Sequence, residues 1–244
     1  MQLYVEFSSE GVTLPLAYRY MVQGLIYKVL SEECDLSHHI HNEGNQGEGK
    51  QFKLFSFGPL TGPHRVVGKN ICFFDRISLE IRSCRRDMML RLLQGLHPGQ
   101  VVHLGDRPLR VLRCSLEDRQ IETGDIWIQT CSPVVSYITH SDGHTQFFSP
   151  EEELFYRLIS KNSSRKWISC FPQEPCPSLL VSPVDGASFT KQVTTFKNTR
   201  ITAWSGQFRL QGEPKLLNFL YQTGLGAKNS QGFGLFRELP SISR

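Results

Sequence analysis

Three histidines that could transfer protons, His38, His39 and His41, lie close together in the 244-residue sequence. The unperturbed pKa of histidine is about 6.5, so its ring can both accept and donate a proton near neutral pH. Taken alone, each of the three is more often an exposed loop residue. The spacing His39-x-His41-x-Glu43 also resembles part of a metal cluster. It lacks an obvious fourth ligand, so we expect no metal site.

A glycine-rich segment over residues 224–234 could approach a ligand closely through its backbone. Its glycines are Gly224, Gly226, Gly232 and Gly234, and the donors between them are Lys228, Asn229, Ser230 and Gln231. These donors suit phosphates or RNA hydroxyls. A helix is expected before the segment and a strand after it, which is the reverse of a dinucleotide-binding turn, so we expect no nicotinamide or flavin site. The alternative is a helix-capping glycine followed by an ordinary loop.

The elements that must position these residues begin with a strand over 2–7, where apolar side chains alternate. Pro15 suits the first turn of a helix that runs to about Leu30. This helix is apolar on more than one side, which predicts that it lies between a sheet and a second domain. The polar histidine loop then leads to a strand over 52–57. The other elements expected in the first half are a strand over 71–81, a helix over 84–96, and strands over 100–104 and 108–116.

The same order repeats after a charged linker over 117–120. A strand is expected at 126–128, and the capping box at 149–152, with proline at the first helical position, predicts a helix toward Cys170. The remaining elements are strands over 179–183 and 192–209, a short helix from Pro214, and a strand over 233–239. Two copies of βαββαβ fit this order better than one doubly wound parallel sheet. We therefore expect an α+β protein of two tandem ferredoxin-like (RRM-like) domains, over 1–118 and 119–244.

Composition gives weaker indications of function. The net charge of +4 is only mildly basic, but seven Lys and Arg residues fall between positions 161 and 209 and suggest a phosphate-binding face, with a solvated surface as the alternative. The seven cysteines show no C-x-x-C spacing, which favours reduced thiols. No run approaches the roughly 18 apolar residues of a membrane span, and the N-terminus does not resemble a signal peptide. We expect a cytoplasmic protein.

The glycine-rich segment also carries a family resemblance. Residues 224–236, preceded by Ala203-Trp204, resemble the signature loop of the RAMP superfamily. In the first half, Leu14-Pro15, Gln23-Gly24-Leu25-Ile26-Tyr27 and the run from Phe52 to Phe57 resemble the opening pattern of CRISPR-associated endoribonucleases that cut precursor repeat RNA, the Cas-six family. The two patterns together extend the resemblance over essentially the whole chain.

This resemblance implies a metal-independent endoribonuclease without a cofactor. A ribose 2′-hydroxyl would attack the adjacent phosphorus and leave a 2′,3′-cyclic phosphate and a 5′-hydroxyl, which requires a base, a positive charge and an acid. The resemblance implies that His41 is the proton-transferring histidine, that Tyr27 positions or helps to deprotonate the 2′-oxygen, and that Lys53 is the positive charge beside the developing phosphorane. Lys50 is a rival for Lys53, because the pattern does not fix the loop length. From the residues alone, Tyr27 is more simply a core aromatic and Lys53 a polar residue on a strand.

The implied partner is CRISPR repeat RNA, both precursor and mature guide. The glycine segment together with Lys191, Lys197 and Arg200 would bind its phosphates. Other subunits of a CRISPR effector complex and a second copy of the chain are further partners to consider. Two alternatives remain open: a non-catalytic RNA-binding RAMP subunit, and a structural scaffold that binds only protein.

Overall fold

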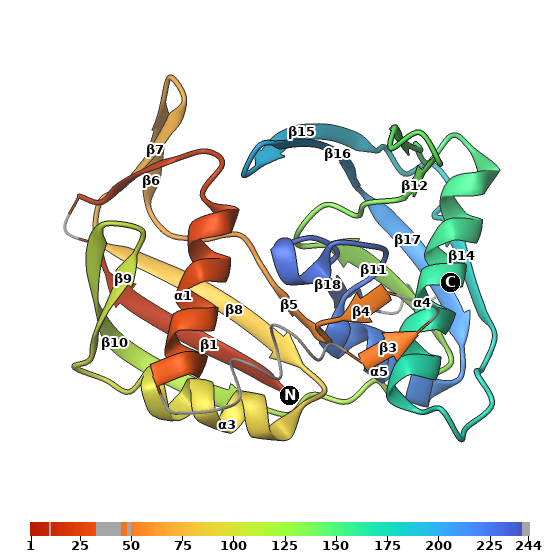
Figure 1. Ribbon diagram of the computed structural model, residues 1–244, viewed down its shortest axis with the longest axis horizontal. Coiled ribbons are helices and arrows are strands. Elements are labelled where there is room, and N and C mark those ends of the chain that lie inside the picture. Colours follow the sequence, from red (N-terminus) through yellow and green to blue (C-terminus); the bar gives the residue numbers. More distant parts are fainter. Residues whose placement is uncertain (10, 33–44, 48–49, 241–244) are drawn as a thin grey trace.

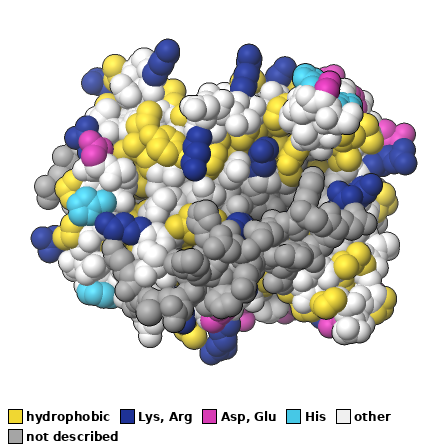
Figure 2. Space-filling model, in the orientation of Figure 1, with side chains coloured by type: hydrophobic (Ala, Val, Ile, Leu, Met, Phe, Trp, Pro, Cys, Tyr) yellow, Lys and Arg dark blue, Asp and Glu magenta, His cyan; other side chains and the backbone are white. Residues whose placement is uncertain are grey.

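The computed structural model describes residues 1–9, 11–32, 45–47 and 50–240. Figure 1 shows two halves side by side, each with helices packed on an antiparallel sheet, and the first half contains the N-terminus. In the same orientation, the Lys and Arg side chains lie mostly across the upper and middle parts of the face (Figure 2). Within the described ranges, no helix combines the length and apolar character needed to cross a membrane.

The first half is built on a five-stranded sheet with the order β5-β8-β1-β10-β9. Its elements are β1 (Gln2–Ser8), α1 (Arg19–Glu32), β5 (Phe55–Phe57), β8 (Arg76–Ser83), α3 (Arg86–Gly95), β9 (Val101–Leu104) and β10 (Arg107–Glu117). If the edge strand β9 is left out, the elements follow one another along the chain as βαββαβ. In the sheet, the first of these strands lies between the third and the fourth. This is the ferredoxin-like arrangement expected from the sequence.

The second half repeats this arrangement in a four-stranded sheet, β14-β17-β11-β18. Its elements are β11 (Asp125–Thr130), α4 (Glu153–Cys170), β14 (Leu179–Pro183), β17 (Gln207–Gly212), α5 (Pro214–Thr223), η1 (Asn229–Gln231, a short 3-10 helix) and β18 (Phe236–Glu238). The expectation of two tandem ferredoxin-like folds is therefore confirmed. The first sheet ends at Glu117 and the second begins at Asp125, so the proposed boundary at residues 118 and 119 falls in the connection between them.

Four smaller β structures extend from these halves. They are the three-stranded unit of β2 (Thr13–Pro15), β7 (Asn70–Phe73) and β6 (His64–Val67), and the hairpins β3 (Asn45–Gly47) with β4 (Lys50–Phe52), β12 (Tyr137–Thr139) with β13 (Thr145–Phe147), and β15 (Thr190–Phe196) with β16 (Thr199–Ser205). In Figure 1, the β15–β16 hairpin runs along the upper edge of the second half.

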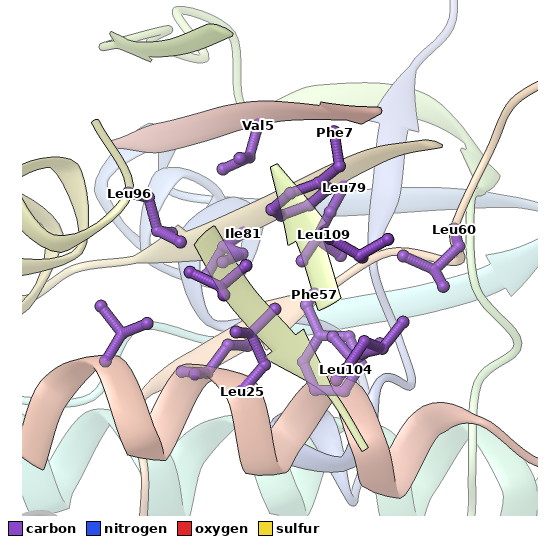
Figure 3. Close-up of a cluster of buried hydrophobic side chains, with 14 of the residues drawn as sticks. Val5, Phe7, Leu25, Phe57, Leu60, Leu79, Ile81, Leu96, Leu104 and Leu109 are labelled. Atoms are coloured by element: carbon purple, nitrogen blue, oxygen red, sulfur yellow. The ribbon is translucent and has the colours of Figure 1, made fainter. Parts of the chain in front are cut away.

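The core of the first half follows from the alternation along β1. Leu3, Val5 and Phe7 are at most 1% exposed, because a strand directs every second side chain to the same face. Figure 3 shows this face covered by α1, whose Leu25 points toward Phe57 and Leu104. The helix is thus buried on its sheet side.

Three expected boundaries were wrong. Pro15 does not begin α1; it pairs with Asn70 as the last residue of β2, and the helix starts at Arg19. The expected capping box keeps one of its two hydrogen bonds, from the Ser149 amide to Glu152 Oε2 at 2.6 Å, but α4 starts only at Glu153. The last strand is shorter than expected because the glycine segment continues to Gly234 without strand pairing.

The expected strand over 52–57 is also divided in two. β4 pairs with β3, whereas β5 pairs with β8 in the first sheet. Between them, Leu54 adopts a φ of +49°, which is rare for a residue with a branched side chain. The physical reason is burial, since Leu54 is 5% exposed and its side chain enters the core of the second half.

Candidate functional site

The glycine loop, residues 224–234, follows α5 and requires glycine at specific positions. At Gly234, with a φ of +76°, an added Cβ atom would lie 1.9 Å from the carbonyl oxygen of Leu225. At Gly232, with a φ of +87°, it would lie 2.6 Å from the ring of Phe57 in β5. The first position closes the loop on itself, and the second lets it pack against the other half of the protein. Both need the absence of a side chain.

The glycine loop is anchored to helix α1 of the first half. Arg19 Nε donates a hydrogen bond to the Gly232 carbonyl at 3.2 Å, and Gln23 Nε2 donates one to the Ser230 carbonyl at 2.7 Å. These two residues are four apart and therefore lie on the same helix face. The next residue in this row is Tyr27. Helix α1 thus presents the candidate catalytic tyrosine from the face that holds the loop.

Tyr27 is half-buried and packs edge-to-face against Phe55, with ring centroids 6.0 Å apart. Burial raises the pKa of its phenol to about 12. The hydroxyl is therefore protonated at neutral pH and can donate a hydrogen bond. The contact with Phe55 shows the packing role expected from the residues alone.

Lys53 lies at the corner between β4 and β5, next to the unusual backbone of Leu54. It is half-buried, and desolvation lowers the pKa of its ammonium group. At this corner the Leu54 side chain packs in the core of the second half. Lys53, next to it, lines a pocket between the two halves. Lys50, the rival candidate, belongs to the hairpin strand β4.

The pocket has a volume of about 260 Å³. Its walls come from four regions: the β4–β5 corner, the segment 135–137 that leads into β12, residues 158–166 of α4, and the end of α5 with the glycine loop. The cationic side chains that line it are Lys53, Lys161, Arg165, Lys166 and Lys228. Among the described lining residues none is Asp or Glu. Such a pocket attracts a polyanion, because its low-dielectric walls concentrate the field of several like charges.

Two residues inside the glycine loop have different environments. Lys228 adopts a φ of +60° and its Nζ lies 5.0 Å from the centroid of the Tyr137 ring, at the pocket wall. Asn229 is 9% exposed, and its side chain is engaged within the protein. Its Nδ2 donates to the carbonyls of Leu225 and Phe233, both at 3.0 Å. Asn229 thus holds the loop together from inside.

The sequence candidates are partly brought together. Lys53 lines the same pocket as Lys228, Asn229, Ser230 and Gln231. Tyr27 on α1 contacts Phe55, and Phe55 is also one of the residues that line the pocket. His38, His39 and His41 lie outside the described residues, in the connection from α1 to β3. The described chain resumes at β3, which lies against α4.

Lys191, Lys197 and Arg200 belong to the β15–β16 hairpin and not to the pocket walls. Lys197 occupies the turn with a φ of +53°. The hairpin packs on the glycine loop, since Phe196 and Ile201 share a buried cluster with Phe233. All three cations are exposed on the hairpin, Lys191 near its base opposite Trp204, and Lys197 and Arg200 at its turn.

Sequence reasoning did not single out the α4 cations as site residues. Lys161 and Arg165 were noted only as part of a basic run. Their spacing of four residues along a helix was a usable signal, because it places both on one face. Lys166 offers no such signal, since its partners lie far along the chain. In the described part of the chain, no group of three His, Cys, Asp or Glu side chains is arranged to hold a metal.

Comparison with protein families adds independent information. The family described as CRISPR associated protein Cas6, C-terminal, matches residues 116–238, just over half of the chain. The chain belongs to the Cas6 family. This match covers the second ferredoxin-like half with the glycine loop, and it confirms the family indicated by the sequence resemblance.

Similarity to Cas6 proteins extends over both halves. The chain is 26% identical to the CRISPR-associated endoribonuclease Cas6 of Pyrococcus furiosus, covering 97% of this chain and 88% of that protein. It is 27% identical to the CRISPR-associated endoribonuclease Cas6 1 of Methanocaldococcus jannaschii, covering 96% and 91%. A solved structure titled "An RAMP protein binding different RNA substrates" superposes with a TM-score of 0.82 at 19% identity, covering 98% of this chain and 99% of that one. This structural likeness confirms the tandem fold.

Proposed function

We propose that this protein is an endoribonuclease that cuts precursor CRISPR RNA within its repeats, without a metal ion, to produce guide RNAs. The observation that carries the proposal is the pocket between the two halves, whose described walls combine cationic side chains with the glycine loop and contain no Asp or Glu. The names of the two curated relatives, both CRISPR-associated endoribonucleases, support the same activity.

The proposed reaction uses the nucleophile that RNA already contains. His41 removes the proton of a ribose 2′-hydroxyl, whose oxygen attacks the adjacent phosphorus. The bond from phosphorus to the 5′-oxygen of the next nucleotide breaks, and that oxygen takes up a proton from water, while His41 releases the proton that it removed to solvent. The products are a 2′,3′-cyclic phosphate and a 5′-hydroxyl. The cleavage reaction therefore needs no oxidant, no reductant and no second substrate.

The described side chains suit the other requirements of this reaction. The ammonium of Lys53 would lie beside the phosphorane, where the negative charge grows. Tyr27 keeps its proton because its pKa is raised to about 12, so it would donate a hydrogen bond and orient a ribose or phosphate oxygen. Lys228 of the glycine loop and Lys161 of α4 would bind the flanking phosphates.

The two halves would then divide the work. The first half, residues 1–118, supplies the catalytic residues, and the second, residues 119–244, supplies the glycine loop. The exposed group of Lys191, Lys197 and Arg200 would bind RNA outside the pocket, which makes the affinity strongly dependent on salt concentration. The mature guide RNA would pass from here to other subunits of a CRISPR effector complex.

The deciding experiment incubates labelled RNA that carries the host's CRISPR repeat with the protein in EDTA. Wild type is compared with His41→Ala and with His103→Ala, a control in an exposed position on β9. We expect cleavage by wild type and by His103→Ala, and loss of cleavage by about 100-fold or more in His41→Ala, the usual range for a general acid or base. Binding without cleavage by wild type would instead support a non-catalytic RNA-binding subunit.

A further inference from the structure

Lys166 of α4 is a buried cation in the wall of the pocket. Only 3% of the residue is exposed. Its Nζ donates hydrogen bonds to the carbonyl oxygen of Gly224 and, at 3.1 Å, to Oδ1 of Asn229. A buried ammonium group is costly unless hydrogen bonds replace its lost hydration, so these two acceptors decide where the side chain lies. Both belong to the glycine loop.

The two acceptors lie at different points of the glycine loop, so the Lys166 side chain holds both its first residue and its middle. Gly224 is the residue at which α5 ends and the loop begins. Asn229 in turn donates to the carbonyls of Leu225 and Phe233, near the two ends of the loop. The ammonium of Lys166 and the carboxamide of Asn229 therefore connect α4 to three loop carbonyls. Without these two side chains, the three buried carbonyls would lose the hydrogen bonds that they accept here.

We propose that Lys166 is a positioning residue that holds the glycine loop in the conformation that binds RNA. This inference deepens the proposed function and rests on it. Lys166 acts through Gly224 and Asn229, whereas Lys228 and Ser230 present the loop's outer surface to the pocket. The glycine loop would be ordered before RNA binds, so the binding free energy is not reduced by the entropy cost of ordering the loop.

The electrostatic surroundings add a second property. Burial lowers the pKa of Lys166 to about 7, and nearby Cys84 opposes this shift. The other charged or titratable residues that line the pocket are Lys161 and Arg165 on α4, Lys53 at the β4–β5 corner, Tyr137 of β12 and Lys228 in the loop. An RNA phosphate in the pocket favours the protonated form, so binding takes up a proton when the pH is above about 7.

The test compares wild type with Lys166→Met, which has similar length but no charge or donor. Arg157→Met is the matched control, because Arg157 lies exposed on the same helix and does not line the pocket. Lys166→Gln, which keeps a donor, serves as a second variant if Lys166→Met does not fold. Two measurements are made: amide hydrogen exchange of residues 224–234 without RNA, and single-turnover cleavage of repeat RNA as a function of enzyme concentration from pH 6.5 to 8.5.

We expect faster exchange in the glycine loop of Lys166→Met and a half-saturating enzyme concentration raised about tenfold or more, with a smaller change in the maximal rate. The half-saturating concentration of wild type should also rise with pH above 7, and Lys166→Met should lack this component. Unchanged exchange, or faster exchange with an unchanged half-saturating concentration, would overturn the inference. Failure of wild type to bind or cut the RNA would instead refute the proposed function, and the hydrogen exchange would still report whether Lys166 orders the loop.

Discussion

The guanidinium carbon of Arg82 lies 3.7 Å from the centroid of the Tyr221 ring, and this contact joins the two halves of the protein. Arg82 belongs to β8 of the first sheet and is 2% exposed, and Tyr221 belongs to α5. The same guanidinium donates to the Phe236 carbonyl at 2.7 Å and pairs with Glu80 at 2.6 Å. The pocket walls also come from both halves, so we expect this contact to support the arrangement of the site.

Arg82→Leu should therefore destabilise the whole protein. The substitution leaves the Phe236 carbonyl without its partner and Glu80 without its cation, which typically costs about 3 kcal/mol of unfolding free energy. Urea denaturation measures this loss. Arg110→Leu, on the exposed side of β10, is the control and should change stability by about 0.5 kcal/mol or less. Equal stabilities of the two variants would contradict a structural role for Arg82.

Gly234→Ala should impair the loop far more than an ordinary glycine substitution. A Cβ atom there would lie 1.9 Å from the Leu225 carbonyl oxygen, so the loop must open. Gly68→Ala provides a control with the same kind of strain, because Gly68 also has a positive φ of +58° but no neighbour within 4 Å of an added Cβ. We expect a cost of about 1 kcal/mol in the control and a larger one in Gly234→Ala. Only Gly234→Ala should lose RNA affinity, as measured by filter binding.

Tyr27→Phe separates the two roles of this residue. The phenylalanine ring can keep the edge-to-face packing on Phe55, so the unfolding free energy should change by less than about 1 kcal/mol. If the hydroxyl orients the reacting atoms, the maximal cleavage rate should fall by about 10-fold to 100-fold. Tyr20→Phe, in an exposed position on the same helix, is the control. Identical rates for both variants would leave Tyr27 with a packing role only.

The ferredoxin-like order was predictable because each half alternates strands and helices whose apolar patterns differ in period. The division at Lys53 and Leu54 was not. The local sequence over 52–57 is mostly apolar and favours one continuous strand. The competing force is burial of Leu54 in the core of the other half. That contact joins segments far apart in the chain and leaves no local pattern.

The site shows the same division between local and long-range information. Lys53 and Lys228 belong to short patterns that a single sequence can reveal. Lys166 and Asn229 are separated by 63 positions, and neither neighbourhood indicates that the lysine is buried. A lysine in a helix is usually solvated, so the buried position became visible only in the folded structure.

The lowered pKa of Lys166 predicts how stability depends on pH. Its pKa is about 7 in the folded protein, against an ordinary value of 10.5. Between these two pKa values unfolding takes up a proton, so the contribution of this group to the unfolding free energy rises with pH, by at most about 1.4 kcal/mol per pH unit.

Lys166→Met lacks this contribution. The stability of Lys166→Met relative to wild type should thus decline by about 2 kcal/mol from pH 7 to pH 9, as measured by urea denaturation at both values. RNA affinity of wild type should fall over the same range, because the pocket loses a positive charge while the fold gains stability. Parallel stability curves for the two proteins would show that Lys166 titrates like an exposed lysine.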